Sequence, residues 1–234
     1  MSKPQRLERF EQEAEFLRVC THPAIMRIYD NGTYPEKGEK YPFLIVDYLP
    51  QTLDQLILRT MTTAERVSYT LQLLSALAYL DHHNPPVVHR DVKPKNIFVK
   101  GRSCVLGDFG LMKFLNEDSD IDREIYRDIA GPGMPYYYRS PDLVAYAKGE
   151  AQLTTKSDVF QLGLVVAEMF TGKNPSEPPK EILDPVKLNE LGPISSARGL
   201  GIHELIQQML LFDENKRPEL LISWIFGKAY SGKL

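Results

Sequence analysis

Cysteine and long hydrophobic runs are scarce in this sequence. The two cysteines, Cys20 and Cys104, lie far apart and form no metal-binding or redox spacing. We therefore expect reduced thiols and a cytoplasmic protein. No apolar stretch approaches the roughly 18 residues that a bilayer-spanning helix needs, and the polar residues after Met1 do not form a signal peptide. We therefore expect no membrane segment in this chain.

An excess of charge of one sign is also missing. The net charge is −3 over 234 residues, which gives no electrostatic reason to expect nucleic acid as a partner. Hydrophobic residues make up 43% and charged residues 25% of the chain, which is ordinary for a soluble globular protein. The length suffices for one large domain or for two small domains that share a cleft.

The spacing of apolar residues favours an α+β fold that is mainly helical. Apolar side chains at steps of three and four predict a first helix over 7–17. Residues 41–48 are rich in β-forming side chains and predict a strand, with 25–34 as its partner across a turn. Two shorter strands are predicted at 97–99 and 104–106.

A long helix is predicted after residue 62. Thr62 and Glu65 have the spacing of a capping box, which marks a helix start. Pro85 and Pro86 predict its end. Its apolar stripe is predicted to contain four residues: Val67, Leu71, Leu74 and Ala78.

The remaining chain is predicted to hold further helices and one long loop. Residues 155–172 are apolar almost all round, so we expect a buried helix, and Gly172 fits its C-terminal cap. Residues 201–212 predict another helix. Residues 115–133 contain many acids and no apolar periodicity, which is typical of a loop.

Two polar stretches carry the chemistry. Residues 88–97 read V-H-R-D-V-K-P-K-N-I and residues 107–110 read G-D-F-G. A His-Arg-Asp triplet alone is weak evidence, but here it is joined to Lys93, Asn96 and an Asp-Phe-Gly twelve residues after Asn96. Together they resemble the catalytic loop and metal-binding motif of eukaryotic-type serine/threonine protein kinases.

The resemblance implies transfer of the ATP γ-phosphoryl group to serine or threonine hydroxyls of a protein substrate. Asp91 would accept the hydroxyl proton and Lys93 would face the transferring phosphoryl group. Asn96 and Asp108 would hold Mg²⁺, which prefers oxygen ligands. Lys93, two residues after the catalytic aspartate, is similar to the serine/threonine branch of the family.

Other segments resemble the nucleotide-binding side of the same family. Val46 would be the gatekeeper, the backbone groups of Asp47 and Leu49 would bond the adenine edge, and Phe98 would lie against its ring. Glu13 aligns with the helix glutamate that pairs with the ATP-gripping lysine. Val46 and Phe98 could instead be core residues of any fold, and Glu13 could be a solvated helix acid.

The resemblance extends beyond the catalytic loop. Asp158 corresponds to the buried helix aspartate that ties down this loop, and Arg217 to the late arginine that pairs with an acid, here Asp142. Asp142 is one methylene shorter than the usual glutamate, so a looser pair is expected. Arg90 suggests a segment that is controlled by a negative charge. The sequence offers three sources of this charge: Ser119, Tyr126 or an acid within 117–120. The acidic run could instead be a solvated loop.

The resemblance is incomplete before Glu13 and after Asp108. Only twelve residues precede Glu13, without a glycine, so no Gly-rich loop or strand lysine is present. We therefore expect a chain that begins inside the small lobe of a longer protein, with 1–48 as a small-lobe remnant and 49–234 as the large lobe. From these residues alone we expect weak ATP binding and slow turnover. No threonine lies between Asp108 and Pro141, which leaves the substrate-side geometry open.

Three functions therefore remain open. A serine/threonine protein kinase is favoured by the intact catalytic loop. A catalytically weak, pseudokinase-like binding or regulatory module is the alternative favoured by the missing lysine. A small-molecule phosphotransferase is disfavoured by the match in residues 137–142. The patterns assign neither an oligomeric state nor a particular protein substrate.

Overall fold

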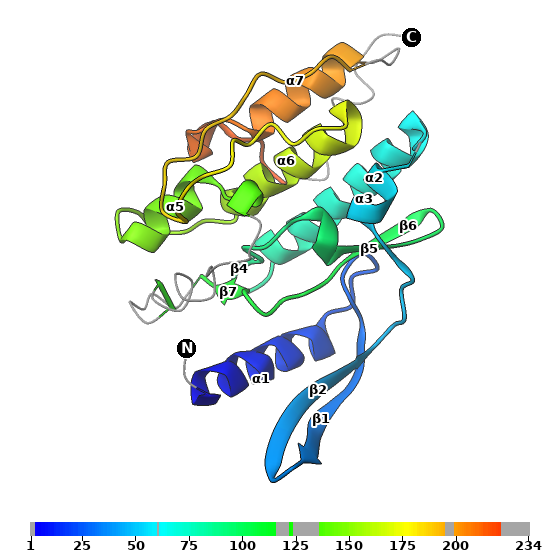
Figure 1. Cartoon of the computed structure of the whole chain (residues 1–234), viewed down its shortest axis with the longest axis vertical. Coiled ribbons are helices and arrows are strands. Elements are labelled where there is room, and N and C mark those ends of the chain that lie inside the picture. Colours follow the sequence, from blue (N-terminus) through cyan, green and yellow to red (C-terminus); the bar gives the residue numbers. More distant parts are fainter. Residues whose placement is uncertain (1–2, 60, 116–121, 124–135, 195–198, 221–234) are drawn as a thin grey trace.

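The computed structural model describes residues 3–59, 61–115, 122–123, 136–194 and 199–220, and it has the expected α+β fold. Figure 1 shows the helix α1 and the hairpin β1–β2 below a larger, mainly helical part. The elements in chain order are α1 (Lys3–Val19), β1 (Ile28–Glu36), β2 (Glu39–Val46), β3 (Gln51–Thr52), α2 (Leu53–Ile57), α3 (Thr63–Asp81), β4 (Val87–Val88), η1 (Pro94–Asn96), β5 (Ile97–Lys100), β6 (Ser103–Leu106), β7 (Lys113–Phe114), η2 (Tyr136–Tyr138), α5 (Pro141–Lys148), α6 (Lys156–Thr171), α7 (Gly199–Met209) and η3 (Glu214–Lys216).

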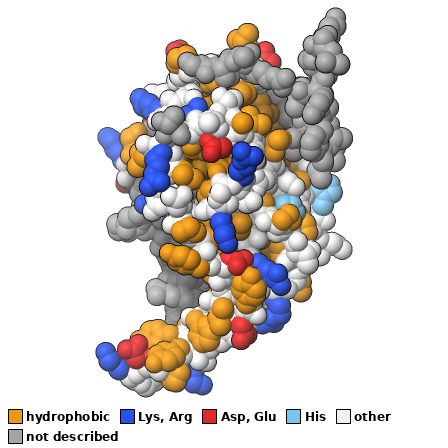
Figure 2. Space-filling model, turned by 90° about the vertical axis from the view of Figure 1, so that its right-hand side faces the viewer, with side chains coloured by type: hydrophobic (Ala, Val, Ile, Leu, Met, Phe, Trp, Pro, Cys, Tyr) orange, Lys and Arg blue, Asp and Glu red, His pale blue; other side chains and the backbone are white. Residues whose placement is uncertain are grey.

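The first two strands form an antiparallel hairpin that extends from the rest of the molecule (Figure 1). It turns at Lys37 and Gly38, which both have positive φ, and the predicted strands are confirmed with bounds shifted by a few residues. Figure 2 shows hydrophobic side chains on this end of the molecule. The exposed hydrophobic residues of the hairpin include Tyr34, Tyr41, Phe43 and Ile45.

The core centres on α6, which packs against α3, α5 and α7 (Figure 1). Every residue from 157 to 167 is buried, which confirms the prediction of a helix that is apolar almost all round. Gly172 caps its C-terminus with φ +75°, a conformation that glycine adopts without strain. Within the described residues, each helix is too short or too polar to cross a lipid bilayer.

Helix α3 begins as predicted and buries Leu74 and Ala78 of the predicted stripe, but its buried face is wider than that stripe. The Glu65 N–H donates to Thr62 Oγ1 at 3.2 Å, and the Thr62 N–H donates to Glu65 Oε2 at 2.8 Å. Val67 is 37% exposed, so its place in the predicted stripe is wrong. The helix contacts both β6 and α6, and this wider contact buries positions that one stripe does not contain, such as Leu73 and Leu77.

The end of α3 also differs from the prediction. The helix ends at Asp81, with His82 as its C-cap, before the prolines are reached. The His82 N–H donates to Ala78 O at 3.1 Å, and the His82 ring nitrogen Nδ1 lies 2.8 Å from the same oxygen. The helix therefore ends at a C-cap that lies three residues before Pro85.

Short strands bring the two chemical stretches together. Strand β4 leads into residues 89–96, and β6 leads into 107–110. Strand β7 then returns to pair with β4, while β5 pairs with β6. The Gly107 N–H donates to Asn96 O at 2.9 Å. This hydrogen bond joins the end of the first stretch to the start of the second, so the two stretches lie side by side.

Candidate active site

Asp91 lies at the centre of the site. Lys93 Nζ is 2.7 Å from Asp91 Oδ2, and Asn96 Nδ2 donates to the same oxygen at 2.8 Å and to Asp91 O at 3.0 Å. Burial raises the pKa of Asp91, and the Lys93 ammonium opposes that rise. The structure therefore brings together three of the predicted residues, with a carboxylate that two donors hold in place.

Asp158 of α6 holds the backbone just before Asp91. Its carboxylate accepts from the His89 N–H at 2.7 Å and from the Arg90 N–H at 2.9 Å. Burial raises the pKa of Asp158 to about 7, and the two N–H donors oppose the rise. Arg90 has φ +67°, a strained conformation for a residue with a side chain. The expected tie between α6 and the catalytic loop is confirmed.

The second stretch is anchored through Phe109. Its ring is fully buried and lies 5.4 Å from the ring of Phe16 and 4.5 Å from that of His89, measured between centroids. Burial lowers the pKa of His89 to about 4, so its neutral ring can donate from Nε2 to Gly107 O, 3.1 Å away. This packing leaves Asp108 exposed, with φ +60°, at the front of the stretch.

Glu13 points from α1 toward this stretch. Its Oε1 accepts from the Phe109 N–H at 3.0 Å, so it is not merely a solvated helix acid. A Cβ placed on Gly110 would lie 3.5 Å from Asp108 Oδ1 and 3.7 Å from Glu13 Oε2. Burial, and then the Asp108 carboxylate, raise the pKa of Glu13 to about 7. Among the described residues, no lysine or arginine forms an ion pair with Glu13.

The residues predicted to bind the nucleotide lie at the end of β2, in the segment that connects β2 to β3, and on β5. Val46 ends β2 and is 38% exposed, so it is not a core residue. Asp47 accepts from the Tyr29 hydroxyl at 2.9 Å, and Leu49 is half-buried in the passage itself. Strand β3 then pairs with β5, which carries the half-buried Phe98.

Phe98 depends on a glycine beside it. A Cβ on Gly107 would lie 2.9 Å from the Phe98 ring, so a side chain there would displace the ring. Phe98 lies on β5, whereas Val46 ends β2 and Leu49 precedes β3. The adenine-binding roles of these residues therefore stay predictions.

The donor set fits a magnesium ion that arrives with a nucleotide. Asn96 commits its Nδ2 to Asp91, which leaves the carbonyl oxygen Oδ1 for a cation, and the Asp108 carboxylate is exposed. The described residues contain no group of three or more His, Cys, Asp or Glu side chains able to hold a metal. Two oxygen ligands completed by phosphates are a common arrangement for Mg²⁺.

Asp122 supplies the negative charge next to Arg90, and the sequence did not single it out. Its carboxylate lies 2.7 Å from Arg90 Nη1 and 2.5 Å from Arg9 Nη2, and it accepts from the Tyr146 hydroxyl at 2.6 Å. Burial raises the pKa of Asp122, but the Arg90 guanidinium and the Tyr146 hydroxyl outweigh this effect and hold the pKa below its usual value. The predicted sources, Ser119, Tyr126 and 117–120, lie outside the described residues.

The predicted pair between Asp142 and Arg217 is confirmed. Arg217 Nη2 lies 2.7 Å from Asp142 Oδ1, and the arginine side chain is fully buried. The carboxylate nevertheless makes no hydrogen bond of normal geometry, because the contact is close but poorly aligned. The ion pair therefore rests on the proximity of the two charges, and the poor alignment agrees with a side chain one methylene too short.

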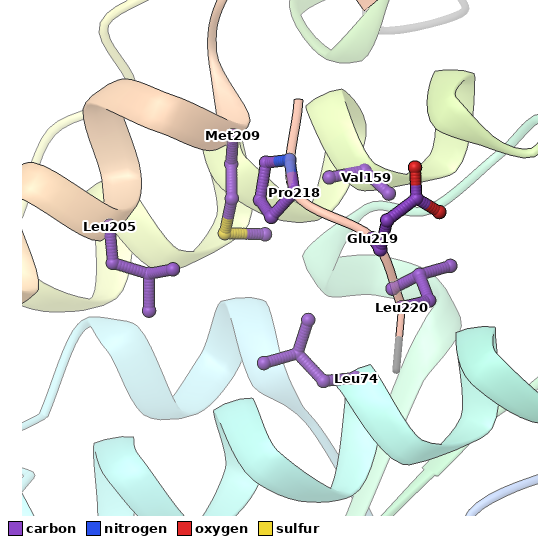
Figure 3. A pocket seen from close by; sticks show the side chains of 7 residues that line it. All are labelled: Leu74, Val159, Leu205, Met209, Pro218, Glu219 and Leu220. Carbon is purple, nitrogen blue, oxygen red and sulfur yellow. The ribbon is translucent and has the colours of Figure 1, made fainter. Parts of the chain in front are cut away.

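An apolar pocket lies elsewhere in the fold. Figure 3 shows it among α3, α6, α7 and the segment that follows η3. None of its lining residues belongs to 89–96 or 107–110, and the seven are Leu74, Val159, Leu205, Met209, Pro218, Glu219 and Leu220. This pocket is therefore separate from the catalytic residues.

Comparison with known proteins agrees with this geometry. The protein kinase domain family matches residues 1–224. Serine/threonine-protein kinase pkn2 of Myxococcus xanthus is 28% identical over 226 residues, which are 91% of this chain and 26% of that protein. Protein kinase gsk31 of Schizosaccharomyces pombe is 33% identical, with 69% of this chain and 42% of that protein covered. U-box domain-containing protein 70 of Oryza sativa subsp. japonica is 32% identical, with 73% of this chain and 21% of that protein covered.

This chain spans less than half the length of each of these relatives. The match to the family nevertheless covers nearly the whole chain, including the catalytic loop and the Asp-Phe-Gly stretch. The chain belongs to the protein kinase domain family.

Proposed function

We propose that this chain transfers the γ-phosphoryl group of ATP to serine or threonine hydroxyls of a protein substrate. The observation that carries the proposal is the buried Asp91 carboxylate, which Lys93 and Asn96 hold at 2.7 and 2.8 Å. Phosphoryl transfer depends on positioning and charge stabilisation more than on covalent chemistry. A fixed carboxylate beside a fixed ammonium provides both.

Each residue has a defined part in this reaction. The substrate hydroxyl oxygen bonds to the γ-phosphorus while the bond from that phosphorus to the β–γ bridging oxygen breaks and ADP leaves. Asp91 accepts the hydroxyl proton. Lys93 stabilises the negative charge of the phosphoryl oxygens from its place beside Asp91. The 2.7 Å contact between Lys93 and Asp91 therefore joins the proton acceptor to the charge-stabilising group.

Members of this family generally use ATP and Mg²⁺, and here Asn96 and Asp108 would hold the metal. Bound Mg²⁺ would supply positive charge to the phosphates. Val46, Asp47, Leu49 and Phe98 would receive the adenine, and Glu13 would lie toward the phosphate end. We place a small-lobe region at 1–48 and a large-lobe region at 49–234, since β2 ends at Val46 and β3 begins at Gln51. We also propose that the protein acts in the cytoplasm.

Asp108→Ala should weaken the binding of magnesium-ATP at least tenfold, because it removes the charged metal ligand. Binding of ATP in the presence of EDTA should change little. Isothermal titration calorimetry with and without Mg²⁺ measures both quantities. Equal magnesium-ATP affinity in the wild type and the variant would contradict the metal-binding role.

The proposed acceptor is tested by phosphoamino-acid analysis. A mixed protein substrate, such as casein, is incubated with the chain, Mg²⁺ and γ-labelled ATP. We expect phosphoserine or phosphothreonine, since Lys93 follows Asp91 in the serine/threonine pattern. A parallel reaction offers aminoglycosides and choline as acceptors. Mainly phosphotyrosine, or a labelled small molecule without labelled protein, would overturn the assignment.

One observation favours a second function, a binding or regulatory module with little turnover. Glu13 accepts a backbone hydrogen bond from Phe109 at 3.0 Å and pairs with no basic residue in the part of the chain that the structure describes. The kinase resemblance expects a lysine at this place. Magnesium-ATP binding without detectable transfer to any protein would favour this second function.

A further inference from the structure

The side chain of Gln161 lies next to the catalytic loop, in the middle of the buried helix α6. It is 2% exposed, and its amide bonds three backbone groups. The Val92 N–H donates to its Oε1 at 3.1 Å, and its Nε2 donates to Arg90 O at 3.0 Å and to Tyr138 O at 2.9 Å. The sequence pattern alone gives Gln161 no separate role.

Two of these bonds flank Asp91. The Arg90 carbonyl belongs to the peptide bond before Asp91, and the Val92 N–H belongs to the peptide bond after it. Gln161 therefore fixes the backbone on both sides of the proposed proton acceptor. Fixing both peptides limits the rotation that would swing the Asp91 carboxylate away from Lys93.

Gln161 and Asp158 act on the same stretch from one face of α6, since residues three apart in a helix are neighbours. Asp158 accepts from the N–H groups of His89 and Arg90. A carboxylate cannot donate to the Arg90 carbonyl, whereas a glutamine amide both donates and accepts. The two side chains together therefore satisfy four backbone groups in the stretch 89–92.

The third bond reaches a different segment. Tyr138 closes η2, just before α5, and its carbonyl accepts from Gln161. The Tyr138 hydroxyl donates to Glu168, which lies two turns further along α6. Helix α6 therefore bonds Tyr138 at its backbone carbonyl and at its hydroxyl. The bond to the carbonyl comes from Gln161, which also bonds the backbone beside Asp91.

We propose that Gln161 is a positioning residue that couples the orientation of Asp91 to the position of the segment around Tyr138. The proposal rests on the proposed kinase function for its catalytic part. A shift of Tyr138 would move the side-chain amide of Gln161, and this amide bonds the peptides on both sides of Asp91. The coupling itself is a property of the hydrogen bonds and can be measured without turnover.

The chemistry of the site narrows the residues that can replace glutamine. Glutamate has the same shape but no donor, so its oxygen would face the carbonyls of Arg90 and Tyr138. Methionine has a similar length and no amide. Asparagine is one methylene shorter and cannot keep all three bonds. We therefore use Gln161→Met and Gln161→Glu, the second as an independent variant if the first does not fold.

The control is Val165→Ala, because Val165 lies on the same helix and is also fully buried. It lowers stability by opening a cavity one helical turn from Gln161, and it removes none of the groups that bond the backbone beside Asp91.

In the full chain, Gln161→Met should lower kcat about 10²-fold, the loss that a small misplacement of a catalytic group can cause. The KM for ATP should change less than about twofold, because adenine contacts are untouched. Val165→Ala, at a similar loss of thermal stability, should keep its kcat within about threefold.

Amide hydrogen exchange provides the readout that needs no activity. In Gln161→Met, the Val92 amide and the amides of 138–140 should both exchange at least tenfold faster than in Val165→Ala. Unchanged protection of Val92, or the same loss of kcat in Val165→Ala, would overturn the positioning role. If the wild type transfers no phosphate, the proposed kinase function fails. The exchange rates of the Val92 and 138–140 amides still decide whether Gln161 couples the two segments.

Discussion

Asp91→Asn should reduce phosphoryl transfer about 10²–10⁴-fold, the usual contribution of a positioned acid or base. Asparagine keeps the shape of the side chain and cannot accept the hydroxyl proton. It also removes the charge that Lys93 contacts at 2.7 Å. The affinity for magnesium-ATP should change little, because Asp91 faces the substrate hydroxyl in the proposed reaction and the metal ligands are Asn96 and Asp108.

The control for this variant is Glu190→Gln, which also neutralises one acid. Glu190 is exposed and has no ion pair within the described residues, so its turnover should match the wild type. Steady-state rates and nucleotide titrations on the same preparations compare the two variants. Near-normal turnover by Asp91→Asn would show that another group accepts the proton.

Asp142→Ala should lower the free energy of unfolding by about 3 kcal/mol, the low end of the cost of breaking a buried ion pair. The fully buried Arg217 guanidinium would lose its counterion, 2.7 Å away. The loss falls at the low end because the guanidinium also donates to the carbonyls of Leu211, Lys156 and Phe212.

Denaturant unfolding at neutral pH measures this loss, with Glu190→Ala as the exposed control, for which no measurable change is expected. Asp142→Glu adds the missing methylene and should retain or increase stability if poor alignment limits the native pair. A wild-type unfolding curve for Asp142→Ala would mean that the three carbonyls alone satisfy Arg217.

The catalytic loop was recognised through its resemblance to the kinase family, whose motif has short, fixed spacings. Lys93 and Asn96 lie two and five residues after Asp91, so local chain geometry alone keeps them near it. The capping box at Thr62 was predictable for the same reason, since both partners lie within one helical turn. Asp158 and Arg217 were found only through the family resemblance, because their partners lie far away in sequence.

Asp122 and Gln161 could not be found in this way. Asp122 stands in an acid-rich stretch whose other members look equivalent in sequence, and only folding brings it against Arg9, Arg90 and Tyr146. Gln161 is a polar residue in an otherwise apolar helix. That exception was the available signal, since a buried amide needs hydrogen-bond partners. Its partners, 69 to 71 and 23 residues away, depend on tertiary structure.

Glu13 shows a different limit of the sequence pattern. The sequence predicted that Glu13 lies in a helix, and the structure places it in α1, where it faces the Asp-Phe-Gly stretch. The family pattern pairs this glutamate with a lysine that the sequence does not place before Glu13, and the structure shows that its carboxylate accepts a hydrogen bond from the Phe109 N–H instead. Burial and the nearby Asp108 carboxylate raise the pKa of Glu13 to about 7, which is the physical consequence of an acid without a counterion.

Phosphoryl transfer at Asp91 is tested most directly by following label from ATP to protein. The full chain is incubated with Mg²⁺, casein and ATP labelled at either the γ- or the α-phosphate, beside Asp91→Asn. We predict Mg²⁺-dependent transfer of the γ-label to serine or threonine, no transfer of the α-label, and loss of transfer in the variant. Transfer of the α-label, or γ-label transfer that Asp91→Asn leaves intact, would contradict the assignment.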